Sequence, residues 1–401
     1  MKNLTIEDAR GRMLAQAAPL GAETVDIQQA HARFLAEPVV AVRDQPPFDS
    51  SAMDGWAICG ADAEAGSVLL DIAGESAAGH GFDGPLQPGQ AVRIFTGAAI
   101  PSGADRVVIQ ENAERLGDKV RLGPLDGDGD NIRPRGGDFM AGARLLEAGQ
   151  RLDAWRLSLA AAAGRGTLSV ARRPRLAVLC TGEELVRPPA EPGPWQIYES
   201  GSLALCALIE TWGGTAQRLA AACDEQDAVI EAVQGVEADL IVTVGGASVG
   251  EYDIVKPALG RLGLELSVQT VNIRPGKPTW FGRLGDGRNV LGLPGNPAAA
   301  MVCAELFLKP MLRAMMGADP EPRFLPARML VPLEANGARM HLMRLLITYA
   351  DDGVMTVRPM ADQDSSLVTV YAQADGLMRR AASAPAAPAG TMVEVLRLDR
   401  L

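Results

Sequence analysis

The middle of the chain alternates between short apolar runs and amphipathic segments of helical length. The run over 240–244 is rich in β-branched residues and is followed by two glycines, as expected for a buried strand that enters a tight turn. This alternation is typical of an α/β domain with a mostly parallel sheet, whose ligands bind beyond the carboxyl ends of the strands. Strands are predicted at 176–180, 215–222 and 240–244, and helices at 202–212, 226–236 and 254–262.

The flanking segments follow other patterns. Helical spacing of apolar residues predicts helices over 5–18, 26–36 and 153–163. Short strands, among them 119–122, 340–349 and 355–359, predict one β-rich unit before the central segment and a small β-barrel or sandwich after it. We therefore expect an α/β multidomain protein. It combines a central α/β domain with a mostly parallel sheet, a β-rich second domain, a helical or extended linker domain and a C-terminal β-barrel-like domain.

Composition narrows the possible functions. The chain has 401 residues, of which 22% are charged and 47% hydrophobic, so it can bury several cores and is not disordered. Its net charge of −11 argues against nucleic acid as a main partner. The five cysteines lack metal-ligand spacing, which indicates reduced thiols. No run reaches the roughly 18 apolar residues of a membrane span, so we expect a cytoplasmic protein with no membrane partner.

A glycine-rich turn follows the strand predicted at 240–244. Gly245, Gly246 and Gly250 permit close backbone approach, and Ser248 is placed to cap the next helix. Free backbone N–H groups at such a helix start favour an anion. Taken alone, the pattern fits a turn that serves only packing equally well.

A carboxylate follows each of the three predicted parallel strands. Glu184 and Thr181 stand after the first strand, Asp224 after the second and Asp253 after the third. Three carboxylates within about 4 Å of one another would repel by roughly 4 kcal/mol per pair at an effective dielectric constant near 20, so they need a cation or raised pKa values. Oxygen ligands without a nearby His or Cys favour Mg²⁺ over zinc. Glu184, Asp224 and Asp253 are therefore candidate magnesium ligands.

Two further turns are candidates for binding an anion. Arg274 and Lys277 present two cations on a short loop flanked by prolines. Pro294, Asn296 and Pro297 join a strand to a helix, with Asn296 at the N-cap and Pro297 at the first helical position. A helix start of this kind attracts anions, although an ordinary well-capped helix has the same pattern.

Polar residues in the flanking segments are weaker candidates. Asp54 lies in a turn that two prolines precede, Thr96 ends a predicted strand, and Asp138 follows two arginines. Arg344 and Ser365 lie in the C-terminal segment and would have to face a neighbouring site. Each of these residues also fits a local cap or a solvated surface.

Together, the motifs are more specific than any one of them. In chain order they are PPFDSSAMDGWA, RIFTGA, RPRGGD, TGEEL, GGASVGEYD, RPGKP and LPGNP. This order resembles that of the MoeA family, the molybdopterin molybdenumtransferases, which also include the E domain of gephyrin. The resemblance covers essentially the whole chain.

The resemblance implies an elongated homodimer of four-domain subunits. Its active site would lie between subunits, formed by the α/β domain of one and the second domain of the other. The implied boundaries are 1–43 with 139–172 for the linker domain, 44–138 for the β-rich domain, 173–318 for a MogA-like α/β domain and 319–401 for the C-terminal domain.

The activity that the resemblance implies is a Mg²⁺-dependent insertion of molybdate into adenylylated molybdopterin, with release of AMP and molybdenum cofactor. A MogA-type adenylyltransferase and molybdoenzyme chaperones are the expected protein partners. By resemblance, the partner subunit would contribute Asp54, Thr96 and Asp138 to one wall of the active site. Carboxylates at its base would hold Mg²⁺: Glu184, Asp224 and Asp253. Molybdate would be bound by Arg274, Lys277, Arg344 and Ser365. The remaining residues expected to contact the substrate are Thr181, Gly245, Gly246, Ser248, Gly250, Pro294, Asn296 and Pro297.

Two departures from the family pattern concern the oxyanion. Arg274 replaces a lysine and keeps the charge, whereas Ala299 replaces a serine and removes a hydroxyl. Tungstate, which has the same charge and nearly the same size as molybdate, is an alternative substrate. Two other functions stay open. One is the preceding adenylylation of molybdopterin, although the enzymes of that step consist of the α/β domain alone. The other is a non-catalytic scaffold or inactive paralogue, and the intact carboxylates argue against it.

Overall fold

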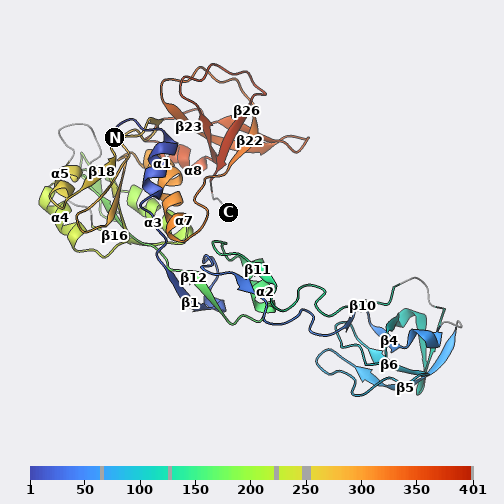
Figure 1. Ribbon diagram of the computed structural model, residues 1–401. Coiled ribbons are helices and arrows are strands. Elements are labelled where there is room, and N and C mark those ends of the chain that lie inside the picture. Colours follow the sequence, from blue (N-terminus) through green and yellow to red (C-terminus); the bar gives the residue numbers. More distant parts are fainter. Residues whose placement is uncertain (64–66, 125–128, 221–224, 246–253, 399–401) are drawn as a thin grey trace.

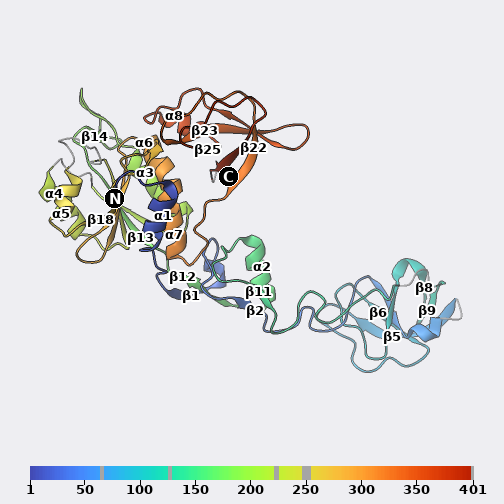
Figure 2. The same cartoon turned by 45° about the horizontal axis from the view of Figure 1, so that its top comes forward.

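The chain forms an elongated molecule, shown as a computed structural model in Figure 1. The structure describes residues 1–63, 67–124, 129–220, 225–245 and 254–398. An α/β domain and a C-terminal barrel lie side by side at one end, and a separate β-sheet lies at the other (Figures 1 and 2). Slender extended segments join the two ends.

The sheet of the α/β domain is built around β17 (Leu240–Val244), in which every residue is buried. The strand order is β16-β13-β17-β21-β20-β18. The first four strands are parallel, and β20 runs antiparallel to both of its neighbours. The strands beside β17 are β16 (Thr215–Arg218), β13 (Arg175–Cys180), β21 (Asn289–Leu293), β20 (Trp280–Arg283) and β18 (Glu265–Val268).

Helices cover both faces of this sheet. One face packs against α1 (Ile6–Leu14), α3 (Gly201–Thr211) and the helical segment after β21, and the other packs against α4 (Gln226–Gln234) and α5 (Val255–Gly260). The segment after β21 comprises α6 (Pro297–Cys303), a π-helical turn (Ala304–Leu308) and α7 (Lys309–Met315). Pro310 has no N–H to donate to the preceding turn, which accounts for the wider π-helical geometry there.

The C-terminal strands close into a barrel. Closure arises because β23 pairs with β25 as well as with β24, which leaves these strands without a free edge. The short β19 (Ile273–Arg274) of the α/β domain also pairs with β23, so it ties the two domains together. The barrel strands are β22 (Phe324–Met329), β23 (Met340–Tyr349), β24 (Met355–Pro359), β25 (Gly376–Arg380) and β26 (Met392–Arg397).

The sheet at the far end has the order β7-β4-β6-β5-β9-β8. Trp56 and Leu70 are buried in one apolar cluster of this part, and Val92 and Ile94 in another. Short 3₁₀ turns occur at Gly60–Ala63 and Gln110–Asn112. The strands are β4 (Gly55–Ile58), β5 (Val68–Ser76), β6 (Gln90–Ile94), β7 (Arg106–Ile109), β8 (Ala113–Leu116) and β9 (Lys119–Leu122).

Paired strands and one helix form the connection between the ends. The pairs are antiparallel, so the chain runs outward and returns alongside itself. They are β1 (Ala22–Asp26) with β12 (Thr167–Ala171), β2 (Val39–Val40) with β11 (Arg144–Leu146), and β3 (Ser50–Ser51) with β10 (Ile132–Arg133); the helix is α2 (Ala154–Ala162).

The helix predicted over 26–36 is wrong. After a 3₁₀ turn at Ile27–Gln29 the segment is not helical, and Ala32 has a positive φ of 62°. The backbone N–H groups of Ala32 and Leu35 donate to the carbonyls of Leu152 and Gln150, at 2.8 and 2.9 Å. The apolar residues at helical spacing are therefore buried by pairing with a segment distant in the sequence, which local spacing does not reveal.

Most of the other predicted elements are present with shifted ends. β9, β17, β23 and β24 have the predicted bounds, whereas the helix expected over 5–18 ends at Leu14 and the strand expected over 215–222 ends at Arg218. The strands β18, β20 and β25 were not predicted. Within the described ranges, no helix is long and apolar enough to cross a membrane.

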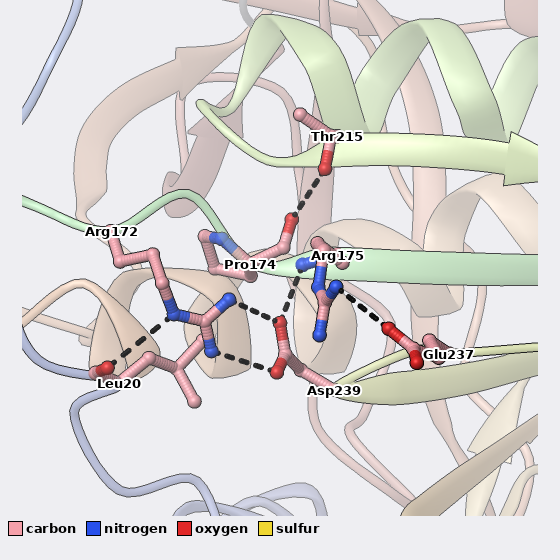
Figure 3. Close-up of polar contacts among 7 residues, drawn as sticks. All are labelled: Leu20, Arg172, Pro174, Arg175, Thr215, Glu237 and Asp239. Atoms are coloured by element: carbon pink, nitrogen blue, oxygen red, sulfur yellow. Dashed lines mark hydrogen bonds and ion pairs between the residues drawn. The ribbon is translucent and has the colours of Figure 1, made fainter.

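Arg172 ties the linker to the α/β domain (Figure 3). Its guanidinium donates to the Asp239 carboxylate at 2.8 and 3.1 Å, and its Nε donates to the Leu20 carbonyl at 3.5 Å. The backbone N–H of Arg175 also donates to Asp239, at 2.7 Å. Burial alone would raise the pKa of Asp239, but the hydrogen bonds from Arg172 and Arg175 lower it. The carboxylate therefore holds the returning linker strand against the start of β17.

We expect Asp239→Asn to reduce the free energy of unfolding at pH 7 by about 1–3 kcal/mol, because it leaves the Arg172 guanidinium incompletely paired. The folded-state pKa of Asp239 lies below its unfolded value, so the stabilisation is complete above about pH 3.9 and is lost as the pH falls through the folded-state pKa. Urea unfolding of both proteins at neutral and acidic pH measures the effect. Equal stability at pH 7 would contradict this role of Asp239.

Candidate functional site

A pocket of about 640 Å³ opens beyond the carboxyl ends of β13 and β17, and we call it the strand-end pocket. Ligands of parallel α/β sheets bind at this edge. The short strands β14 (Leu185–Val186) and β15 (Ile197–Tyr198) supply part of its wall. The predicted site residues that line it are Thr181, Glu184, Gly245, Asn296 and Pro297.

Gly245 allows the ends of β13 and β17 to approach closely. Its φ is +90°, and a Cβ at this position would lie 2.8 Å from the carbonyl oxygen of Thr181. Thr181 is itself buried, and its hydroxyl has no hydrogen-bond partner in the described part of the chain. The pocket wall thus contains a hydroxyl that makes no hydrogen bond to any described residue.

Glu199 organises another wall of the strand-end pocket. It is 3% exposed, accepts hydrogen bonds from the backbone N–H and hydroxyl of Ser202 at 2.7 and 2.6 Å, and pairs with Arg218. Burial alone would raise the pKa of Glu199, but the hydrogen bonds from Ser202 and Arg218 lower it to about 2. Burial raises the pKa of the neighbouring Cys180 thiol to about 12. A charged carboxylate therefore fixes the start of α3 against β13.

A second pocket of about 490 Å³ adjoins the first, and we call it the cation pocket. Gly276 in its loop has a φ of +110°, and a Cβ there would lie 2.3 Å from the Cys303 sulfur, so the loop packs tightly on α6. The polar residues that line the pocket are Arg274, Lys277, Asn296, Arg339, Gln363, Asp364 and Ser365. Fixed positive charge on one side thus faces a polar loop of the barrel.

Arg344 lies fully buried behind this polar loop. Its Nη2 donates to the Asp364 carbonyl at 3.2 Å, whereas Nε and Nη1 have no hydrogen-bond partner among the described residues. Gln363 holds the loop in place, because it both accepts from the backbone N–H and donates to the carbonyl of Arg344, at 2.9 Å each. Burial lowers the pKa of Arg344, but a guanidinium remains protonated near pH 7. A buried cation with two nitrogens unpaired among the described residues favours an anion nearby.

His341 lies beside the cation pocket without adding to its charge. It pairs in register with Arg274, and its Nε2 is buried with no partner in the described ranges. Burial, followed by the positive charges of Arg274, Arg344 and Arg339, lowers the pKa of His341 to about 4. The positive charge near pH 7 therefore comes from the arginines rather than from the imidazole.

The turn Gly295–Asn296 lines both pockets. Asn296 occupies the N-cap position of α6 and Pro297 the first helical position, as predicted. The Asn296 side chain does not cap the helix, however: its Nδ2 donates to the Ser365 hydroxyl at 2.8 Å. A single turn, held to the barrel loop, thus separates the two pockets.

Asp54 and Thr96 contact each other in the distal sheet. The backbone N–H and the hydroxyl of Thr96 each donate to Asp54 at 2.7 Å, and these hydrogen bonds lower the pKa of Asp54. Asp138 is exposed in the connecting segment, and its backbone N–H donates to the Gln45 carbonyl at 2.9 Å. The strands β4 and β6, next to Asp54 and Thr96, lie at the opposite end of the molecule from β13 and β16 (Figures 1 and 2).

Family models match the chain in three consecutive blocks. Residues 4–164 match the MoeA N-terminal region (domain I and II), 177–314 a probable molybdopterin binding domain, and 326–398 the MoeA C-terminal region (domain IV). The chain is also 35% identical to molybdopterin molybdenumtransferase 2 of Mycobacterium tuberculosis, over 93% of this chain and 94% of that protein. The chain belongs to the MoeA family.

Other MoeA proteins agree with this assignment. The chain is 37% identical to the molybdopterin molybdenumtransferase of a Nostoc strain, over 79% of this chain and 75% of that protein. It superposes on the crystal structure of the molybdopterin biosynthesis MoeA protein of Pyrococcus horikoshii with a TM-score of 0.83, 28% identity and full coverage of both chains. The predicted fold class is thereby confirmed, and this MoeA chain is an enzyme of molybdenum cofactor biosynthesis.

In this MoeA chain, the structure brings together two groups of the predicted site residues and leaves a third apart. The strand-end pocket holds Thr181, Glu184, Gly245, Asn296 and Pro297. The cation pocket holds Arg274, Lys277, Pro294, Asn296 and Ser365, with Arg344 behind it. The residues apart from both are Asp54, Thr96 and Asp138. The predicted residues Asp224, Gly246, Ser248, Gly250 and Asp253 lie outside the described residues.

Of the predicted magnesium ligands, only Glu184 lies within the described part of this MoeA chain. It is exposed and lines the strand-end pocket, where its carboxylate is the hard oxygen donor that Mg²⁺ prefers. Among the described residues, no group of three His, Cys, Asp or Glu side chains is placed to hold a metal ion. The residues present therefore fit one ligand of such a site.

Several residues of the two pockets were missed in the sequence. Arg339 lines the cation pocket and directly precedes the strand predicted at 340–349. A positive charge at the start of that strand could have marked it as a candidate anion-binding residue. Gln363 gave no such signal, because its role depends on hydrogen bonds to Arg344 from another segment. Glu199 stands in the segment 198–200, where the family usually has an Asp-Thr-Asn type sequence, but that departure does not reveal its contact with Arg218.

Arg344→Met is expected to separate oxyanion binding from folding. Replacing an incompletely paired buried cation by an apolar side chain of similar length should leave the free energy of unfolding within about 1 kcal/mol of the original value or raise it. Molybdate affinity should fall at least about tenfold, because hydrogen bonds between charged groups contribute about 1.5–3 kcal/mol. Thermal unfolding and isothermal titration with molybdate measure the two effects.

The matched control is Arg358→Met, which changes an exposed arginine on β24 of the same barrel. We expect it to alter neither stability nor molybdate affinity. An Arg344→Met protein that binds molybdate normally would show that this guanidinium has no part in the site.

Proposed function

We propose that this MoeA chain inserts molybdate into adenylylated molybdopterin, in a Mg²⁺-dependent reaction that releases AMP and molybdenum cofactor. One observation carries the proposal: the cation pocket and the strand-end pocket share the turn Gly295–Asn296. A small oxyanion in the first pocket and a larger organic phosphate in the second would meet at this turn.

The cation pocket suits molybdate because molybdate is a small dianion. Arg274 and Lys277 line it, and the buried guanidinium of Arg344 lies behind its polar loop. Arginine and lysine side chains bind oxyanions through charge-assisted hydrogen bonds. Ala299 lines the same pocket and has no hydroxyl to offer the oxyanion. Among the described lining residues, the side-chain hydroxyl comes from Ser365, which accepts a hydrogen bond from Asn296.

The strand-end pocket suits the adenylylated pterin. It is larger than the cation pocket and lies at the edge of the sheet where nucleotides and related ligands bind in α/β domains. Its polar wall includes the carboxylate of Glu184 and the hydroxyl of Thr181, which has no hydrogen-bond partner among the described residues. The Glu199 network keeps the start of α3 in place, so this wall is formed before substrate arrives.

In the proposed reaction the phosphoanhydride between AMP and the pterin phosphate is cleaved, with an oxygen of molybdate or of water as the nucleophile. When bound, Mg²⁺ would neutralise the charge of this phosphoanhydride and favour its cleavage. Glu184 is a proposed ligand on the described side, and Asp224 and Asp253 are proposed from the sequence. The remaining protein groups act by holding the two substrates next to each other, which is a large part of catalysis by such sites.

We further propose that the active site is completed by a second copy of the chain. Asp54, Thr96 and Asp138 belong to the distal sheet and its connections, whereas both pockets lie at the opposite end of the same chain (Figure 1). An elongated subunit can place its distal sheet against the pockets of a partner in a two-fold arrangement. The expected protein partners, a MogA-type adenylyltransferase and molybdoenzyme chaperones, stay predictions, as does the cytoplasmic location.

The proposed reaction predicts AMP release that requires both Mg²⁺ and molybdate. Purified protein would be mixed with adenylylated molybdopterin and AMP followed by chromatography. Glu184→Gln should slow AMP release at least about tenfold, the loss expected when a metal ligand is weakened. The control Glu191→Gln changes an exposed carboxylate between β14 and β15 that does not line the strand-end pocket, and it should keep the original rate. Release of AMP at the same rate without molybdate would refute the proposal.

The two-fold arrangement predicts complementation between inactive variants. Asp54→Ala and Glu184→Gln proteins should each be nearly inactive, and their equal mixture after subunit exchange should regain about one quarter of the original activity, because half of the dimers are mixed and each mixed dimer has one intact site. Activity assays before and after exchange test this expectation. If the mixture stays as inactive as its components, the three distal residues do not act across a subunit boundary.

A further inference from the structure

A third cavity, of about 690 Å³, lies where the linker, the α/β domain and the barrel meet. Its walls come from the loop 148–151 before α2, from α7 and the segment 317–323, and from β22 and β26 of the barrel. Figures 1 and 2 both show α7, α2 and the start of the barrel converging near the middle of the molecule. The cavity shares no lining residue with the strand-end or cation pocket, so we call it the junction cavity.

The junction cavity is strongly basic although the whole chain has a net charge of −11. Among the described residues of its wall, basic side chains outnumber carboxylates by a wide margin. The basic residues are Arg151, Arg156, Lys309, Arg313, Arg323 and Arg397, and the carboxylates are Glu305 and Asp319. A concentration of one sign of charge in a concave site attracts ligands of the opposite sign.

Some of these cations are neutralised by neighbours. Lys309 is buried on α7, pairs with Glu305 at 3.1 Å and lies 5.4 Å from the centre of the Trp212 ring. Arg156 pairs with Asp153 one turn earlier in the chain. These contacts hold Lys309 and Arg156 in place and pair each of them with a carboxylate.

Two cations on different domains have no such partner in the part of the chain that the structure describes. Within the described ranges, neither Arg151 in the linker nor Arg313 on α7 has a carboxylate oxygen within 4.0 Å. Arg313 lies one helical turn after Lys309, so both point toward the same side of α7. Arg151 and Arg313 line the same cavity from separate elements, and like charges repel unless an anion lies between them.

Apolar surface accompanies this charge. Phe34, Leu325 and Leu396 line the junction cavity together with prolines of the segment 317–323. Apolar side chains beside these charges can contact the organic part of a ligand, and sites for small organic ligands commonly have volumes of about 300–1,000 Å³. The junction cavity falls in this range.

We propose that the junction cavity binds a small anion that carries two or more phosphate groups. Two phosphate groups can contact Arg151 and Arg313 at once, and an organic portion can pack on Phe34 and Leu396. Walls from three parts of the chain favour a compact ligand over an extended acidic peptide. A bound anion would join the linker to the α/β domain, next to the segment that carries the distal sheet.

Isothermal titration of the full-length protein with inorganic pyrophosphate, without added metal, tests the proposal. Arg313→Glu should weaken binding at the junction cavity at least about tenfold, since it replaces an attractive charge by a repulsive one. Arg151→Glu, on a different element, should do the same and guards against a folding defect in one variant; circular dichroism and thermal unfolding verify the fold of both. Arg358→Glu, which reverses an exposed arginine on β24 outside the cavity, should change the affinity less than about twofold.

The cation pocket is a competing site for pyrophosphate, so the titration is repeated with Lys277→Glu. Binding that survives Lys277→Glu and is lost in both Arg313→Glu and Arg151→Glu supports the junction cavity. Binding that follows Lys277 alone, or no binding at all, overturns the proposal. A hexaglutamate peptide is the second probe: if it binds in an Arg313-dependent manner and pyrophosphate does not, the cavity recognises an acidic peptide and the proposed ligand is wrong.

Discussion

A buried guanidinium costs free energy unless its nitrogens find hydrogen-bond partners. Arg344 is fully buried in β23, and two of its three nitrogens have no partner among the described residues. The barrel keeps the side chain in place through the Asp364 carbonyl and through Gln363, which is hydrogen-bonded to the Arg344 backbone. The loop that holds Nη2 lines the cation pocket, so this buried positive charge lies next to the proposed oxyanion site.

The geometry around this charge depends on contacts between the barrel and the α/β domain. β19, which contains Arg274, pairs with β23, and Asn296 at the start of α6 is hydrogen-bonded to Ser365. The same turn lines the strand-end pocket, so the position of the oxyanion relative to the strand ends is set by two domain contacts. At the other edge of the α/β domain, Arg172 and Asp239 hold the linker that leads to the distal sheet. The barrel and the linker to the distal sheet are thus both held against the same α/β domain.

Much of this arrangement could be predicted from sequence because its signals are local. The apolar run that forms β17, the proline after Asn296 and the Arg274 to Lys277 loop each identify an element or a turn from neighbouring residues. The resemblance to the family extended these signals to residues that have no local signature, such as Arg344.

Features that depend on pairing between distant segments could not be predicted in this way. The segment 26–36 has helical spacing, yet it pairs with residues near 150 and 170. Asn296 stands at the N-cap position of α6, yet its side chain donates a hydrogen bond to Ser365, 69 positions away, and does not cap the helix. Glu199 is a site residue only because Arg218 reaches it from β16. In each case a long-range contact outweighs the local preference.

The most direct test of the account is anomalous X-ray diffraction from crystals soaked in tungstate, used as a heavy substitute for molybdate. We predict a tungsten peak in the cation pocket, within contact distance of Arg274, Lys277 and Ser365. A peak elsewhere with this pocket empty would contradict the assignment of the oxyanion site and, with it, the proposed meeting of the two substrates at Asn296.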